Sequence, residues 1–221
     1  MNRQEKTPFY TKLLEYANSD VASFDVPGHK LGNISNEMIK NNGEMIYKLD
    51  ANSPRGLDNL NHPNGVIKEA EELCAEAFGA DHVFFLVNGC TSAIQIMLMS
   101  VIKENDYVLD MCAAPGSKTQ YISELMNNKG KVLALDIHPH RVEIMKKMLS
   151  SLGLSNVTCI CYDSTKLTEK NKLIESFDKV LLDAPCLGLG VVRRKPDILL
   201  NLKDENLDEI EAIQAKLLDQ A

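Results

Sequence analysis

Short apolar runs alternate with helical patterns over the second half of the chain. Four runs with the length of strands end at or beside an acidic residue, at positions 107–110, 131–136, 156–162 and 178–182. Apolar positions recur at helical spacing over 119–126, 141–152 and 206–221. Strands that alternate with helices are typical of α/β folds with a parallel sheet.

The first half has a less regular pattern. Residues 7–17 and 66–78 show the apolar spacing of amphipathic helices, and Gly79 is the expected end of the second helix. Residues 83–87 are predicted to form a buried strand, and residues 92–102 a helix with a Met-rich face. Stretches rich in Pro, Gly and Asn separate the first two helices, and they predict long loops.

The sharpest turn signal lies between residues 107 and 119. An apolar run ends in Asp110, and an Ala-Ala-Pro-Gly turn leads into the next predicted helix. Pro115 fixes its own φ and Gly116 has no Cβ, so the backbone can bend and admit a ligand close to its N–H groups. N–H groups at a helix start suit a carboxylate or a phosphate. The pattern by itself fits both a ligand-binding turn and an ordinary strand-to-helix turn.

Acidic residues follow the later predicted strands as well. Asp136 ends the second strand, 20 positions after Gly116, and Asp163 and Asp183 follow the third and fourth strands. Parallel strands bring such residues to one edge of the sheet, where open α/β folds bind ligands. A carboxylate at the end of the second strand can accept from ribose hydroxyls, although an acid there can also be a helix cap.

Two strings carry a family resemblance. Asp-Met-Cys-Ala-Ala-Pro-Gly-Ser-Lys-Thr (110–119) resembles the first motif of the RNA cytosine-5 methyltransferases related to ribosomal RNA small-subunit methyltransferase B. Asp-Ala-Pro-Cys (183–186), with Gly-Val-Val-Arg-Arg-Lys-Pro-Asp (190–197), resembles the fourth motif. The resemblance covers residues from about 104 to 221. It implies the Rossmann-like parallel sheet of a class I S-adenosylmethionine-dependent methyltransferase, here incomplete.

The resemblance also implies a set of site residues. In that family the first-motif loop holds the methionine end of S-adenosylmethionine, and the matching positions are Cys112, Ala113, Ala114, Pro115, Gly116, Ser117 and Lys118. Asp136 would take the ribose and Asp163 the adenine region, while Asp183 would approach the target cytosine and the methyl donor. RNA is the implied partner, and Arg193, Arg194 and Lys195 form a small basic patch suited to its phosphates. Three basic residues can equally be a solvated loop.

The resemblance predicts impaired turnover. Such enzymes add a cysteine thiolate to carbon-6 of cytosine, and the base must first be unstacked. In this RNA family the nucleophile resembles a Thr-Cys on a later strand, and the cysteine after Ala-Pro assists product release. Cys186 matches the second role, and no Thr-Cys follows Leu217. Cytosine-5 DNA methyltransferases use a Pro-Cys nucleophile, so a catalytic role for Cys186 stays open.

Three stretches of the first half resemble a different family. Phe-Asp-Val-Pro-Gly-His-Lys (24–30), residues 58–67 and residues 87–94 are similar to the amino-terminal part of the ornithine/lysine/arginine decarboxylases. Those are pyridoxal-phosphate enzymes of the aspartate-aminotransferase fold, so the resemblance implies part of that fold. Gly89, Cys90 and Thr91 would lie at the cofactor phosphate, although Cys90 departs from the expected hydroxyl residue.

Pyridoxal phosphate is nevertheless not an expected cofactor. The chemistry needs an aldimine lysine and an acid for the pyridine nitrogen. Nothing in the chain matches their motifs, and Lys30 belongs to the early Pro-Gly-His-Lys motif. His29 and His62 are expected to be structural. A decarboxylase fragment and a folded module without a ligand are the alternative interpretations.

The two resemblances meet near residues 103–110, where both families have a helix, a polar turn and an apolar strand. We predict a chimera with segments 1–102 and 103–221, whether natural, designed or a product of misassembled sequence. The helix at 92–102 would then replace the helix that precedes the first methyltransferase motif, a kind of change that cores tolerate.

Composition narrows the classes of protein to which the chain can belong. The net charge of −7 argues against general nucleic-acid binding but allows a local basic patch. No apolar run approaches the ~20 residues of a membrane span, and the amino terminus lacks the apolar segment of a secretory signal, so a soluble cytoplasmic protein is expected. The six cysteines lack zinc spacing, so no metal is expected. Cys159 and Cys161 share one strand face and are expected to be buried and inert.

Overall fold

The computed structural model describes residues 2–22, 24, 28–32, 43, 45–52, 56–169, 175–201 and 204–221, with the side chains of all of these except 168, 169, 201 and 204–206. Parts of the predicted loops, residues 25–27 and 53–55, lie outside this description. The chain divides into two compact units, Met1–Val87 and Asn88–Ala221. Each is considered by itself.

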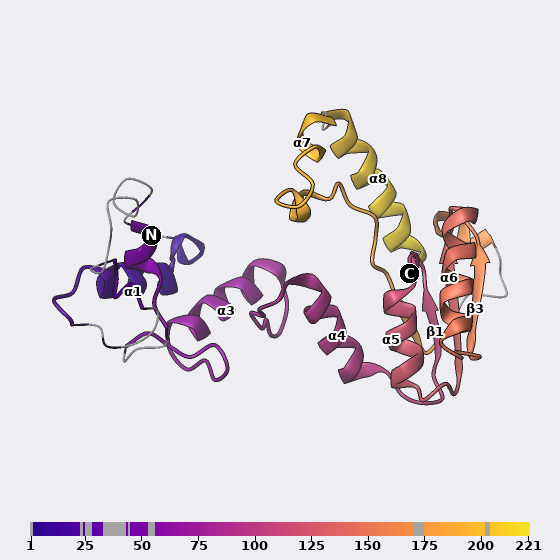
Figure 1. The fold of residues 1–221 in the computed structure, drawn as a ribbon, viewed down its shortest axis with the longest axis horizontal. Coiled ribbons are helices and arrows are strands. Elements are labelled where there is room, and N and C mark those ends of the chain that lie inside the picture. Colours follow the sequence, from indigo (N-terminus) through magenta and orange to yellow (C-terminus); the bar gives the residue numbers. More distant parts are fainter. Residues whose placement is uncertain are drawn as a thin grey trace. The chain divides into compact units, whose positions relative to one another are not determined.

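The helices of the first unit confirm the sequence pattern. After the short 3-10 turn η1 (Arg3–Glu5), α1 (Pro8–Ala17) begins with Pro8 in its first turn, where a missing N–H costs nothing. α3 (Val66–Phe78) ends at Gly79, whose φ of 64° is the left-handed conformation of a helix C-cap. α1 and α3 pack against each other (Figure 1).

The strand predicted at residues 83–87 is wrong. These residues have no regular secondary structure, and Phe84 is 73% exposed. The backbone N–H of Phe85 donates to the buried carboxylate of Glu71 on α3 rather than to another strand. A strand needs a neighbour for its backbone groups, and the described part of this unit offers no strand for 83–87 to pair with.

The second unit contains the predicted alternation of strands and helices. Its elements are α4 (Gly89–Val101), β1 (Tyr107–Asp110), α5 (Ser117–Leu125), β2 (Lys131–Asp136), α6 (Pro139–Ser151), β3 (Val157–Cys161), η2 (Ser164–Glu169), β4 (Lys179–Leu181), η3 (Leu189–Val191), α7 (Ile198–Asn201) and α8 (Asp204–Gln220). The boundaries of the four strands differ from the prediction by at most one residue at either end.

The four strands form one parallel sheet in the order β3-β2-β1-β4. From β1 the chain builds outward through β2 and β3 on one side, and then returns to place β4 on the other side of β1. This reversal between β1 and β4 is the topological switch point at which open α/β sheets bind ligands, beyond the carboxyl ends of the strands. The predicted Rossmann-like parallel sheet is therefore confirmed.

Successive residues of each strand pack on opposite faces of the sheet. Val108 and Val132 contact the helices α4 and α5 in one buried cluster. Leu109 and Leu133 belong to a second cluster on the other face, which includes Leu217 of α8. A third cluster joins the sheet to α6 through Met145 and Leu149, together with Ala113 and Ala134.

Helix α4 belongs to the core of the second unit. Its Leu98 is 3% exposed and packs with Ile122 of α5 and with Met126, the residue that follows α5. The helix predicted at 92–102 thus lies where a helix before the first methyltransferase motif is expected. The compact unit begins at Asn88, and the segment boundary after residue 102 stays a prediction.

Candidate functional site

The parallel sheet brings the predicted acids to one edge. Asp110 and Asp136 are the last residues of β1 and β2. Asp136 pairs in register with Cys161, the last residue of β3, and Asp163 lies two positions farther on. Asp183 follows β4 by two positions in the same way. The structure therefore places the first-motif loop and the three later acids at the same carboxyl edge.

The loop between β1 and α5 is fixed by backbone hydrogen bonds to both neighbouring strands. The Met111 N–H donates to the Leu181 carbonyl over 3.0 Å, and the Ala113 N–H donates to the Leu135 carbonyl over 2.7 Å. The loop then turns at Gly116, whose N–H donates to the Ala113 carbonyl over 2.8 Å. The loop thus lies across the switch point.

Gly116 is the N-cap residue of α5 and has a φ of 107°. A Cβ here would lie 2.8 Å from Cγ of Met145, so the loop packs directly on α6. No side chain caps α5. Its first N–H groups are left for solvent or for an anionic ligand group.

Asp110 is buried behind this loop. The Thr119 hydroxyl donates to its Oδ2 over 2.7 Å, and its Oδ1 has no hydrogen-bond partner among the described residues. Burial raises the pKa of Asp110 to about 6, although the Thr119 hydroxyl and the charge of Lys118 act to lower it. A hydrogen-bond donor that reached Oδ1 would stabilise the charged form.

The Asp136 carboxylate has two partners around it and is only 5% exposed as a residue. Its Oδ1 accepts from the His138 N–H over 2.9 Å, at the start of α6. Its Oδ2 lies 3.5 Å from Nη1 of Arg141. Asp136 thus takes part in the helix start, as one of the two sequence interpretations expects, and it also lies at the ligand edge.

Asp163 and Asp183 are each held by a basic residue. Asp163 accepts from the Thr165 hydroxyl over 2.7 Å and lies 3.5 Å from Nζ of Lys166. The Thr165 hydroxyl, with its N–H and Lys166, lowers the pKa of Asp163 against the opposing effect of partial burial. Lys118 of the first-motif loop lies 2.5 Å from Oδ2 of Asp183, so this ion pair joins the loops that follow β1 and β4.

The cysteines of the edge differ in exposure and reactivity. Cys186 is exposed, and the side chain of Gln214 on α8 donates to the preceding Pro185 carbonyl over 2.8 Å. Burial, with the charges of nearby acids, raises the pKa of the half-buried Cys112 to about 11, so this thiol is protonated at neutral pH. A thiol in that state is a poor nucleophile.

Cys159 and Cys161 correct one expectation. Cys159 is half-buried beside α6, but Cys161 is exposed. The reason is that β3 is an edge strand whose outer residues have little cover: Ile160 is 43% exposed. The prediction that both thiols are buried is therefore wrong for Cys161.

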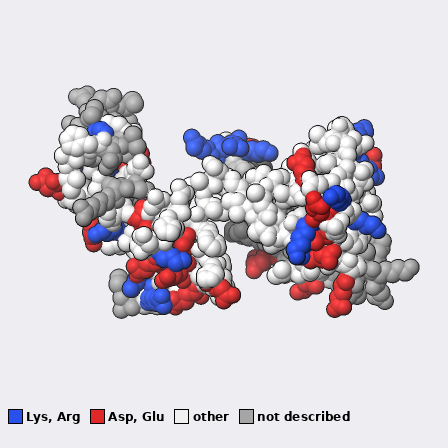
Figure 2. Space-filling view, turned by 90° about the horizontal axis from the view of Figure 1, so that it is seen from below, with Lys and Arg blue, Asp and Glu red and all other residues white. Residues whose placement is uncertain are grey.

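Arg193, Arg194 and Lys195 follow η3 and are all exposed. None of them forms an ion pair with another described residue. Figure 2 shows that charged side chains gather in clusters on the surface, with wide uncharged areas between them. A local basic patch is thus compatible with the net charge of −7.

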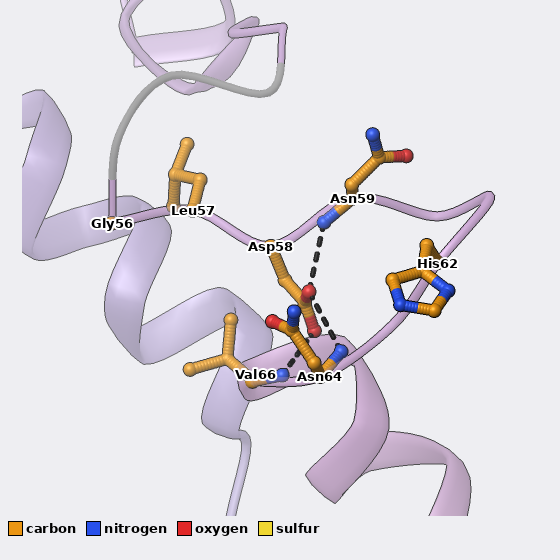
Figure 3. Close-up of a pocket in the computed structure, with 8 residues that line it drawn as sticks. Gly56, Leu57, Asp58, Asn59, His62, Asn64 and Val66 are labelled. Atoms are coloured by element: carbon orange, nitrogen blue, oxygen red, sulfur yellow. Dashed lines mark hydrogen bonds between the residues drawn. The ribbon is translucent and has the colours of Figure 1, made fainter.

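The first unit has an open pocket of about 520 Å³, lined by residues between Gly56 and Val66 in the loop before α3 (Figure 3). Asp58 lines it, but its carboxylate accepts from the N–H groups of Asn64, Gly65 and Ile67 at 2.8–3.0 Å. Its oxygens therefore cap the start of α3. The acidic side chain of this pocket thus has a structural role.

The histidines of the first unit have different surroundings. Nδ1 of His29 accepts from the Gly32 N–H over 3.3 Å, and its Nε2 lies 3.1 Å from Oδ2 of Asp50. His62 is exposed at the pocket. In the described part of the chain, no group of three His, Cys, Asp or Glu residues could hold a metal ion. No described helix is both long enough and apolar enough to cross a bilayer.

Comparison with known proteins assigns the second unit. The family model described as 16S rRNA methyltransferase RsmB/F matches residues 97–221. The chain belongs to this family. A second model, described as Orn/Lys/Arg decarboxylase, major domain, matches residues 7–113. Both predicted resemblances are confirmed, and the two matches overlap over residues 97–113, from the end of α4 through β1 to the start of the first-motif loop.

Individual relatives agree with the family. The chain is 43% identical over 116 residues to the probable ribosomal RNA small subunit methyltransferase B of Bacillus subtilis, which covers 52% of the chain and 26% of that protein. It is 35% identical over 134 residues to the 28S rRNA (cytosine-C(5))-methyltransferase of Mus musculus, covering 61% and 16%. The chain therefore spans about a quarter or less of these relatives.

Solved structures support the fold. The crystal structure of NSun6 from Pyrococcus horikoshii with SFG is 32% identical, with a TM-score of 0.52, and the match covers 61% of this chain and 33% of that one. The crystal structure of PH0851 is 33% identical, with a TM-score of 0.55, covering 62% and 30%. The decarboxylase part is indicated by its family model alone.

Two site residues escaped the sequence analysis. Thr119 was part of the first motif but had no assigned partner, and it holds Asp110. Arg141 contacts both the loop and Asp136. A basic residue in the first turn of a helix opposes the helix dipole, and that unfavourable placement is the signal that could have identified it.

Proposed function

We propose that residues 103–221 bind S-adenosylmethionine at the carboxyl edge of the sheet, as the donor-binding part of an RNA cytosine-5 methyltransferase. The observation that carries the proposal is that the loop 112–118 lies at the same carboxyl edge of the sheet as Asp136, Asp163 and Asp183, with Lys118 paired to Asp183 beside the switch point between β1 and β4. Family membership and the names of the relatives support the same reaction class.

The residues present fit this cofactor in charge and in hydrogen bonding. The ligand carries a sulfonium, an ammonium and a carboxylate. Uncapped N–H groups at the start of α5 suit the carboxylate. The unpartnered Oδ1 of buried Asp110 suits a donor such as the ammonium, and the acids along the edge suit the positive charges.

Different residues of the chain would then bind different parts of the cofactor. Cys112 to Lys118 would hold the methionine end, Asp136 the ribose and Asp163 the adenine region. The bound cofactor would supply an electrophilic methyl group. Asp183, held by Lys118, would face the target base, and the exposed Cys186 would assist release of the product.

RNA is the proposed partner, bound in part by Arg193, Arg194 and Lys195. A cytoplasmic location belongs to the same proposal. We propose that donor binding, rather than full turnover, is the activity of residues 1–221, because the thiols assigned to the site are the protonated Cys112 and the accessory Cys186. Pyridoxal phosphate is not proposed as a cofactor, and addition of it should give no aldimine absorption.

Calorimetric titration with S-adenosylhomocysteine tests the proposal. The wild-type protein should bind, and Asp136→Ala should weaken binding by roughly tenfold or more, because the buried carboxylate proposed to accept from the ribose hydroxyls is lost. Glu143→Ala removes the same charge from an exposed position on α6 and should leave the affinity unchanged. A folded wild-type protein that gives no binding heat would end the proposal.

A further inference from the structure

The side chain of Arg141 connects two parts of the proposed donor site. Its Nη2 donates to the carbonyl of Ala114 in the first-motif loop over 2.8 Å. Its Nη1 lies 3.5 Å from Oδ2 of Asp136. One guanidinium thus reaches both the loop after β1 and the acid at the end of β2, and its planar fork of donors can serve two acceptors at once.

The position of Arg141 on its helix is unfavourable by itself. Arg141 lies in the first turn of α6, and that turn contains no acidic residue. Positive charge at that end opposes the helix dipole. The contacts to Ala114 and Asp136 are the described interactions that offset this cost.

Helix α6 is a rigid support for such a contact. Val142, next to Arg141, is 1% exposed, and Met145 is fully buried. The loop rests on the same helix, since a Cβ on Gly116 would lie 2.8 Å from Met145 and 2.9 Å from Met148. The backbone of Arg141 is therefore fixed relative to the loop that its side chain holds.

The two carboxylate oxygens of Asp136 have separate partners. The His138 N–H occupies Oδ1, and Arg141 faces Oδ2. Removal of the guanidinium would leave Oδ2 without this partner and the Ala114 carbonyl without its donor. The carboxylate could then rotate, and the loop would lose its tie to α6.

We infer that Arg141 is a positioning residue that sets the orientation of the Asp136 carboxylate and of the loop 112–118 for the methyl donor. This inference rests on the proposed function for its ligand. Its structural part, the tie between α6 and the loop, can be measured in the ligand-free protein.

Two measurements on the full chain test the inference. Hydrogen exchange of the Ala113 and Gly116 amides, both hydrogen-bonded in the loop, reports on the loop itself. Titration with S-adenosylhomocysteine reports on the ligand. Arg141→Gln should speed exchange of both amides and weaken binding by roughly tenfold, the typical value of one charge-assisted hydrogen bond. Arg141→Lys keeps the charge but has no planar fork. It should therefore recover part of the amide protection and part of the ligand affinity that Arg141→Gln loses.

Lys147→Gln is the matched control, because it removes one positive charge from an exposed position on the same helix. It should change neither measurement. If Arg141→Gln keeps wild-type exchange and wild-type affinity, the inference is wrong. If the wild-type protein does not bind the ligand, the proposed function fails, and the exchange rates still decide whether Arg141 holds the loop.

Discussion

The hydroxyl of Thr119 donates to Oδ2 of Asp110 over 2.7 Å, and both side chains are almost completely buried. The bond joins the end of β1 to the first turns of α5, directly behind the loop of the proposed donor site. Since Oδ1 of Asp110 has no partner among the described residues, this hydroxyl is the carboxylate's one described side-chain donor.

Thr119→Val should therefore destabilise the second unit. Valine keeps the shape of threonine but leaves the buried carboxylate without its side-chain donor, at a cost of about 2–3 kcal/mol. Urea unfolding at pH 7 measures the loss. Thr158→Val makes the same change at an exposed position of β3 and should stay within about 0.5 kcal/mol of wild type. Equal losses in the two variants would show that the bond to Asp110 contributes nothing.

The raised pKa of Asp110 predicts a pH dependence of stability. Burial raises this pKa from 3.8 to about 6 in the folded state. Between these two values the folded protein keeps a proton that the unfolded chain has lost, so stability falls as the pH rises from about 4 to above 6. The shift corresponds to about 3 kcal/mol.

Asp110→Asn, which cannot ionise, should lack this fall. The measurement is the free energy of unfolding of both proteins between pH 4 and 7.5, because the difference between them cancels the other groups that titrate. A difference that does not change with pH would contradict the assigned pKa.

Asp58 predicts the opposite dependence in the first unit. Partial burial raises its pKa, but the N–H groups of Asn64, Gly65, Asn59 and Lys68 lower it more, to about 2. The stabilisation is therefore complete above pH 3.8 and is lost as the pH falls toward 2. Asp58→Ala should cost about 1–2 kcal/mol at pH 7, the typical value of a lost helix cap.

The measurement is denaturant unfolding at pH 7 and at pH 2.5, followed by circular dichroism. The cost of Asp58→Ala should be smaller at the lower pH. Asp81→Ala removes an exposed acid from the same unit and serves as the control. If both variants lose the same stability at both pH values, Asp58 does not cap α3.

The sequence predicted much of the methyltransferase sheet, because its strands are buried and carry a continuous apolar pattern. Strand β2 lies at the predicted residues 131–136. The prediction failed at residues 83–87, where an equally apolar run has no neighbouring strand to pair with among the described residues. Apolarity predicts burial, but a strand also needs a partner, and local sequence does not contain that information.

The candidate site was predictable to a similar extent. Position after a strand was enough to bring Asp136, Asp163 and Asp183 to one edge, since parallel strands end together. The contacts that fix these acids were not predictable, because the bond from Arg141 to Ala114 spans 27 positions and depends on how α6 packs.

Gly116 should not tolerate a side chain. Alanine there would have to adopt a φ of 107°, and its Cβ would collide with Met145 at 2.8 Å. Gly153 also has a positive φ, of 72°, but has open space around it. Gly153→Ala should therefore cost about 1 kcal/mol for the backbone conformation, and Gly116→Ala should cost more because the loop must also move. Thermal unfolding measures the stability of both variants. An equal loss of stability would mean that the Met145 side chain moves away from the new Cβ without a cost in free energy.

The basic patch predicts how RNA binding depends on salt. Replacement of Arg193, Arg194 and Lys195 by Ala removes three exposed cations from one short segment. If they contact phosphates of single-stranded RNA, binding should weaken, and the slope of log K against log salt should fall by roughly 2, at about 0.7 for each contact. Filter binding of a labelled RNA at several salt concentrations measures both quantities.

The control for this experiment is a second triple variant of equal charge. Replacement of Lys131, Lys146 and Lys147 by Ala removes three exposed cations from β2 and α6. It should leave the slope close to the wild-type value, since these residues lie outside the proposed RNA-binding segment. The same loss of slope in both triple variants would show that RNA responds only to the total charge, and the assignment of residues 193–195 to RNA binding would then be wrong.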